Sequence, residues 1–152
     1  MLTTKQTSKI VPPLRRRRMT KSAYRGLAAF RFALRQFLSF SEIVAASAGI
    51  TTQQYQALLA LKAAEDETLS VKELAQELLL AQNAAVQLID RLEVLKLAKR
   101  TGSKIDRRSV TISLTQSGQA LIQRLASEHV GELARHEPLL AESLRRLRQI
   151  GK

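Results

Sequence analysis

The feature that most constrains the fold is the succession of helical and strand patterns over residues 70–118. Ser70 and Glu73 have the spacing of a capping box, in which each side chain bonds the other residue's backbone N–H, so a helix is expected to start there. After a tight turn, apolar residues recur with helical spacing and predict a second helix. The buried faces are expected at Val71, Leu74, Ala75 and Leu78 in the first helix, and at Val86, Leu88, Ile89, Leu92 and Leu95 in the second.

Two short strands are predicted next, at residues 97–100 and 110–114. Val110, Ile112 and Leu114 alternate with polar residues, as in a strand with one buried face. The segment 101–104 is expected to form a turn because it has no apolar residue, and Thr115 is expected to cap a further helix. A helix, a turn, a second helix and a two-stranded hairpin in this order predict a winged helix-turn-helix.

Helices are also predicted on both sides of this core. From residue 20, an apolar seam with alternating steps of three and four residues continues to Gly49. So long a seam needs a partner surface, and a second subunit is the simplest one. Pro138 is expected to break the chain before a last amphipathic helix, which gives a mainly α fold of about six helices with a two-stranded β-wing. The seam consists of Leu27, Phe30, Leu34, Phe37, Ser41, Val44 and Ala48.

Positive charge is concentrated in two segments of a chain whose formal net charge is +12. The first 19 residues contain Lys5, Lys9 and the run from Arg15 to Arg18, with no acidic residue. Residues 96–108 contain six Lys or Arg residues and a single acid, Asp106. A basic excess of this kind favours a polyanionic partner, either nucleic acid or an acidic membrane surface.

The N-terminal residues 1–19 are interpreted as a flexible basic arm, because they are polar and interrupted by Pro12 and Pro13. Two interpretations stay open for this arm. It is either a tail without a role, or a DNA-contacting arm whose arginines neutralise phosphates or enter a minor groove.

The second helix of the core carries polar side chains that suit the reading of DNA bases. A helix in the major groove contacts base edges with residues near its N-terminus, and amide side chains bond adenine bidentately. An ordinary solvated face is the other explanation, and the neighbouring basic hairpin favours DNA. The residues expected at this surface are Gln82, Asn83, Ala84 and Gln87, with Arg91 further along the helix.

The hairpin has the charge of a DNA-binding wing. Lys104, Arg107 and Arg108 have the reach to follow phosphates or to enter the minor groove. Asp106 is interpreted as the partner that orients Arg108 through a charge-assisted pair, or else as a residue that forms the turn.

These motifs together resemble the multiple-antibiotic-resistance regulator (MarR) family. The resemblance implies a transcriptional regulator, often a repressor released by a small phenolic or aromatic carboxylate ligand. It also implies a homodimer whose first and last helices form the interface and whose two lobes bind a pseudo-palindromic operator on double-stranded DNA. The motifs are Glu73-Leu74-Ala75, Leu88-Ile89-Asp90-Arg91-Leu92-Glu93, Arg100 with Asp106-Arg107-Arg108, and Leu114-Thr115 with Gly118.

By position, the resemblance places base reading on the start of the second helix and minor-groove contact on Arg108, with Asp106 as its acidic companion. Two residues depart from the family pattern: Leu79, where Gly is common, and Ala81, where Ser or Thr often caps the helix. A missing cap costs about 1 kcal/mol of helix-start stability. A ligand pocket between the dimerisation helices and the lobe is expected near Tyr24, Phe30, Arg31, Arg35, Phe37 and Tyr55.

These expectations divide the chain into four parts: an arm at 1–19, a dimerisation helix at 20–50, a winged helix-turn-helix DNA-binding domain at 51–118, and C-terminal dimerisation helices at 119–152. An architectural DNA-binding module or a winged helix that binds protein is the alternative. A preference for one duplex over random sequence would separate a regulator from an architectural binder.

Other functional classes find little support in the sequence. The chain has no Cys, which excludes disulfides, cysteine zinc sites and thiol-based sensing. It has neither an apolar run of membrane-spanning length nor the apolar region of a secretory signal, so a cytoplasmic protein is expected. His129, Glu132 and His136 share a helix face, but solvated or interface residues are favoured over a metal site there. No catalytic motif stands out, so neither an enzyme nor a cofactor is expected.

Overall fold

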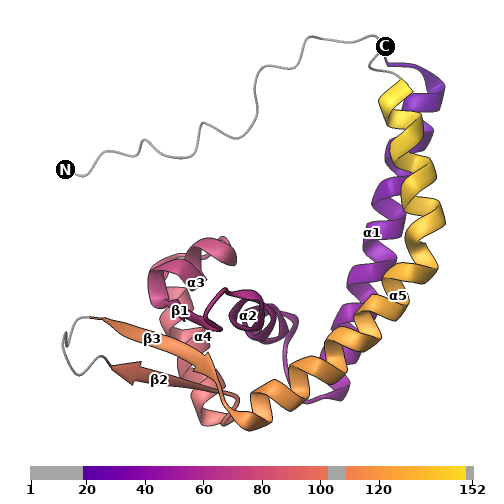
Figure 1. Ribbon diagram of the computed structural model, residues 1–152. Coiled ribbons are helices and arrows are strands. Elements are labelled where there is room, and N and C mark those ends of the chain that lie inside the picture. Colours follow the sequence, from indigo (N-terminus) through magenta and orange to yellow (C-terminus); the bar gives the residue numbers. More distant parts are fainter. Residues whose placement is uncertain (1–18, 103–108, 150–152) are drawn as a thin grey trace, which may run out of the picture. The chain divides into compact units, whose positions relative to one another are not determined.

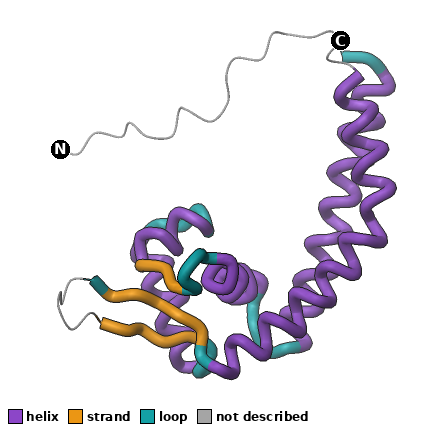
Figure 2. The backbone as a smooth tube through the Cα atoms, viewed as in Figure 1, coloured by secondary structure: helices purple, strands orange, loops and turns teal. Residues whose placement is uncertain are grey.

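The computed structural model describes residues 19–102 and 109–149. These residues divide into two compact units: the first takes those up to Ala33 and from Pro138 onwards, and the second is Leu34–Glu137. The helices and strands are drawn in Figures 1 and 2. In chain order they are α1 (Lys21–Ser47), α2 (Thr52–Ala63), β1 (Thr68–Ser70), α3 (Val71–Glu77), α4 (Gln82–Val94), β2 (Ala98–Gly102), β3 (Val110–Leu114) and α5 (Gln116–Gln149).

The second unit has the predicted winged helix-turn-helix order, with the core between the helices and the sheet. Capping boxes at Thr51–Gln54 and Ser70–Glu73 start α2 and α3, so the helix start predicted at Ser70 is confirmed. Six large side chains from α2, α3, α4 and β3 are fully buried in this core, and two more come from α5. They are Leu58, Leu61, Leu74, Ile89, Leu92 and Ile112, joined by Ile122 and Leu125.

The sheet has three antiparallel strands in the order β1-β3-β2, where two were predicted. The extra strand, β1, pairs Leu69 with Ile112 of the central strand β3. This strand could not be predicted, because three residues are too few to show an alternating pattern. In consequence β2, which pairs only with β3 within the described residues, lies at one edge of the sheet.

The junction between β3 and α5 explains the Leu-Thr-x-x-Gly motif. The Thr115 hydroxyl accepts a hydrogen bond from the Gly118 N–H at 3.1 Å and donates one to the Lys96 carbonyl at 2.6 Å. A Cβ atom at position 118 would lie 2.0 Å from the carbonyl oxygen of Leu97. Only glycine therefore allows α5 to start this close to the chain leading into β2, and the predicted cap at Thr115 is confirmed.

Pro138 does not break the chain, so the described residues contain five helices and not the expected six. It lies inside α5, a single helix of 34 residues. A proline removes one backbone hydrogen bond and crowds the preceding turn, which more often kinks a long helix than ends it when the flanking turns keep their bonds.

Two apolar residues that were expected in the core are exposed. The side chains of α4 that are buried are Ala85, Leu88, Ile89 and Leu92, whereas Val86 and Leu95 are 37% and 43% exposed. In α1, Ser41 and Val44 of the predicted seam are buried, but Leu27 and Leu34 remain about 40% exposed. Within the part of the chain that the structure describes, no helix is long and apolar enough to cross a membrane.

Candidate nucleic-acid interface

The turn between α3 and α4 presents the start of α4. The N–H of Leu80 bonds the carbonyl of Ala75 and the N–H of Leu79 bonds that of Gln76, which is a Schellman motif. This motif needs a residue in the left-handed conformation, which glycine adopts most easily, and here Leu79 adopts it with φ = 54°. A side chain in this conformation costs about 1 kcal/mol. Leu79, where the resemblance led us to expect Gly, is thus the left-handed residue of this turn.

The polar residues predicted to read DNA lie on one exposed face of α4. Gln82, Asn83 and Gln87 are exposed, and Ala84 is half-buried beside them. The N-cap residue Ala81 makes no side-chain hydrogen bond, as its methyl group dictates. The Asn83 Oδ1 atom accepts a hydrogen bond from the Ala84 N–H at 3.0 Å, which partly replaces the missing cap.

Arg91 lies at the margin of this face, beside an open groove of about 570 Å³. Unlike the amide residues, it is in the C-terminal half of α4. The groove is mostly apolar, and it lies between the start of α2 and the end of α4. Its lining residues are Gly49, Ile50, Thr51, Gln54, Asp90, Arg91, Val94 and Leu95.

The wing is described up to the ends of its two strands. β2 and β3 pair from Ala98 with Leu114 to Gly102 with Val110, so the predicted hairpin is present. Lys104, Asp106, Arg107 and Arg108 lie outside the described residues, as does the basic arm up to Arg18. The pairing proposed between Asp106 and Arg108 therefore stays a prediction.

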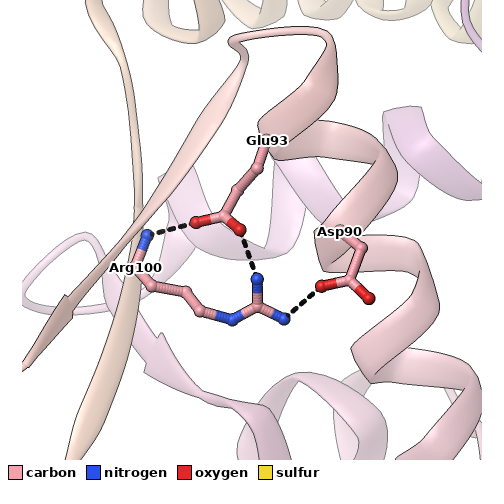
Figure 3. A network of polar contacts seen from close by, with 3 residues as sticks. All are labelled: Asp90, Glu93 and Arg100. Atoms are coloured by element: carbon pink, nitrogen blue, oxygen red, sulfur yellow. Dashed lines mark hydrogen bonds and ion pairs between the residues drawn. The ribbon is translucent and has the colours of Figure 1, made fainter.

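An ion-pair network that the motif analysis missed joins the wing to α4 (Figure 3). The guanidinium of Arg100 in β2 contacts Asp90 through Nη2 at 2.7 Å, and Glu93 through Nη1. Burial alone would lower the pKa of Arg100, but the hydrogen bonds and charges of Asp90 and Glu93 outweigh that effect and raise it. The signal was present in the sequence, because two acids three residues apart on a helix face precede a lone strand arginine.

The six residues predicted to line a ligand pocket fall in both units. Tyr24, Phe30 and Arg31 belong to the first, and Arg35, Phe37 and Tyr55 to the second. Tyr24 is 59% exposed, and both arginines are exposed. None of the six lines the groove beside Arg91.

Two of these pocket residues pack around a buried histidine instead. Tyr55 stacks on the ring of His129 with centroids 4.2 Å apart, and the edges of Phe37 and Phe40 complete the enclosure. His129 is 4% exposed, and its Nδ1–H donates to the Leu125 carbonyl while Nε2 accepts from the Ser41 hydroxyl. Burial also raises the pKa of Tyr55.

The other members of the histidine set are directed elsewhere. His136 donates to the carbonyl of Glu132 at 3.0 Å, and the Glu132 carboxylate pairs with Arg135 at 2.8 Å. Among residues 19–102 and 109–149, no three His, Asp or Glu side chains are grouped in a way that could hold a metal ion.

Comparison with known proteins supports the motif assignment. Residues 48–109 match the model of the MarR family. The transcriptional regulator PrsX of Escherichia coli is 40% identical over 77 residues, which cover 51% of this chain and 46% of PrsX. The organic hydroperoxide resistance regulator of Bacillus subtilis is 37% identical over 99 residues, 65% of either chain. The match thus spans from about half to two thirds of the length of these relatives.

Solved structures agree on the fold. AbsC, a MarR family regulator from Streptomyces coelicolor, superposes with a TM-score of 0.70 at 24% identity over 88% of this chain and 91% of its own. A second MarR family regulator from the same organism, solved in complex with DNA, gives 0.68 at 20% identity over 90% of this chain and 89% of its own. The family and these relatives are transcriptional regulators and not enzymes. Residues 48–109 of this chain are therefore similar to the MarR family.

Proposed function

We propose that this protein is a sequence-specific regulator of transcription that binds a pseudo-palindromic operator on double-stranded DNA as a homodimer. The observation that carries the proposal is the exposed face of α4, where Gln82, Asn83 and Gln87 project from the helix of a winged helix-turn-helix. Amide side chains at the start of such a helix suit bidentate bonds to adenine. A MarR family regulator with this fold has been solved in complex with DNA.

We assign DNA binding and dimerisation to different parts of the chain. Residues 51–118 bind DNA, with Lys104, Arg107 and Arg108 of the wing adding phosphate or minor-groove contacts oriented by Asp106. Residues 20–50 and 119–152 form the dimer. Support for the dimer comes from α1, where Tyr24, Leu27, Leu34 and Leu38 are exposed at intervals of three, seven and four residues, which place them on one face of the helix.

The proposed mode of regulation is repression relieved by a small aromatic or phenolic ligand. Phe37 and Tyr55 pack against His129, so such a ligand would have to use other residues, such as Arg31 with the exposed Tyr24 and the half-buried Phe30 in the first unit, or Arg35 in the second. Thermal unfolding with and without a panel of aromatic carboxylates tests this part, and absence of any shift would contradict it.

A competition experiment tests the central proposal. The protein selects duplexes from a random library, and its affinity is then measured for the selected duplex and for a shuffled duplex of equal length at several salt concentrations. A sequence-specific regulator should prefer the selected duplex by about 10³-fold. Equal affinities with a steep salt dependence would instead favour an architectural DNA-binding module.

A further inference from the structure

The edge strand β2 has one of its outward N–H groups capped by a carboxylate. Because β2 pairs only with β3 in the described sheet, N–H groups on its outer side have no strand to bond. The backbone N–H of Arg100 donates to Oε1 of Glu93 at 2.9 Å. The acceptor belongs to α4, so this bond fastens the strand to the helix.

The side chain of Arg100 fastens the same two elements again. Its Nη2 atom donates to Oδ1 of Asp90 at 2.7 Å, and its Nη1 atom donates to Oε2 of Glu93 (Figure 3). Only 28% of this side chain is exposed, so the contacts are partly shielded from water and salt. A guanidinium in contact with two carboxylates holds a defined orientation, which a point charge would not.

The two elements joined in this way are those to which the proposed function assigns the DNA contacts. α4 carries the residues proposed to read bases, and β2 leads into the wing. The turn between them is short and ends α4 with a Schellman motif in which Lys96 has φ = 57°. The chain and the network together therefore restrict how the strand can move against the helix.

We propose that Arg100 is a positioning residue for DNA binding: through Asp90 and Glu93 it fixes the wing strand against the recognition helix, so that both engage one duplex together. This rests on the proposed function. In this role Arg100 acts through geometry and leaves the phosphate contacts to other basic residues.

The direction in which Glu93→Gln changes DNA affinity distinguishes a positioning role of the network from a simple effect of charge. This substitution removes a negative charge, so electrostatics alone would tighten binding to any duplex. If the network positions the wing, Glu93→Gln should instead weaken binding to the selected duplex by about tenfold. Asp90→Asn should act in the same direction and less strongly, since Asp90 makes one of the three bonds. Tighter or unchanged binding by Glu93→Gln would overturn the proposal.

A matched pair of substitutions in β2 provides the second test. Lys99→Gln and Arg100→Gln each remove one positive charge from neighbouring residues, and Lys99 is exposed. Arg100→Gln should weaken binding at least about tenfold more than Lys99→Gln while leaving the salt dependence unchanged, because no phosphate contact is lost. Arg100→Lys keeps the charge and should recover only part of the affinity. Equal losses for Lys99→Gln and Arg100→Gln, or full recovery with lysine, would contradict the positioning role.

A measurement on the free protein distinguishes failure of this proposal from failure of the proposed function. Hydrogen exchange of the Arg100 amide should accelerate about tenfold in Glu93→Ala, whereas the Ile112 amide in the central strand should be little affected. Thermal unfolding of the same variant checks that the fold persists. If the exchange rate of the Arg100 amide is unchanged, the network does not hold the strand in solution, and the positioning proposal fails whether or not the wild-type protein binds DNA. If exchange of the Arg100 amide accelerates in Glu93→Ala as expected, but the wild-type protein does not bind DNA, only the proposed function is rejected.

Discussion

The winged-helix lobe and the long helices α1 and α5 differ in what they do with large apolar side chains. In the lobe, Leu58, Leu74 and Ile112 are fully buried. In α1 the fully buried apolar residues are small, Ala23, Ala33 and Ala45, while Leu38 and Phe32 are at least half exposed. The lobe therefore completes its own core, whereas α1 leaves large apolar side chains exposed, and the proposed dimer would cover them.

The largest expected effect is on the stability of the lobe. Leu92 of α4 is fully buried, so Leu92→Ala should lower the free energy of unfolding by about 3 kcal/mol through lost burial and a cavity. Val94→Ala, on the same helix but 82% exposed in the wild type, should change it by less than about 0.5 kcal/mol. Denaturant unfolding of both variants is the measurement. Equal losses of unfolding free energy in the two variants would mean that the buried core of the lobe does not provide its stability.

A charge in the exposed stripe of α1 should break the dimer. Leu38→Asp places a carboxylate where 56% of an apolar side chain is exposed, and it should raise the dimer dissociation constant about 100-fold, roughly 2.7 kcal/mol. Gln36→Asp introduces the same charge outside the stripe and should have little effect. Sedimentation over a range of concentrations measures both. If the wild-type protein is a monomer, or if Leu38→Asp leaves the dissociation constant unchanged, α1 does not form the dimer interface.

His129 provides a test within the helices that flank the lobe. His129→Ala removes a stacked ring and leaves the Ser41 hydroxyl and Leu125 carbonyl without their partner, so it should cost about 2 kcal/mol. His136→Ala, which loses contacts only within its own helix, should cost less than about 1 kcal/mol. Thermal unfolding at one pH compares the two. Similar losses would show that the aromatic enclosure adds no stability.

Arg108 tests the wing directly. Arg108→Ala should weaken binding to the selected duplex by about 10-fold to 30-fold if its guanidinium enters the minor groove or pairs with phosphates, and the dimer should remain intact. Fluorescence anisotropy and sedimentation report the two properties separately. Unchanged affinity would mean that Arg108 makes no contact with DNA that contributes to binding.

The difference between the two regions also explains what the sequence could predict. Local signals gave the capping box at Ser70, the cap at Thr115 and the paired strands, since each depends on residues close in the chain. The strand β1 depends on pairing with the distant strand β3 and was missed. The network of Arg100 was also missed, although Asp90 and Glu93 lie within ten residues of it, because a side-chain contact between a helix and a strand follows no fixed spacing. The seam predicted in α1 is buried at Ser41 and Val44 and partly exposed at Leu27 and Leu34, because periodicity marks an apolar face without saying which molecule covers it.

The smallest effect concerns the turn that starts α4. Leu79 is 90% exposed and has φ = 54°, so Leu79→Gly should relieve backbone strain while adding freedom to the unfolded chain. These terms oppose each other, and a net gain of up to about 1 kcal/mol is expected. Leu78→Gly, one residue earlier at φ = −93°, relieves no such strain and should destabilise the protein. A loss of stability on Leu79→Gly would mean that the added freedom of the unfolded chain outweighs the relief of backbone strain.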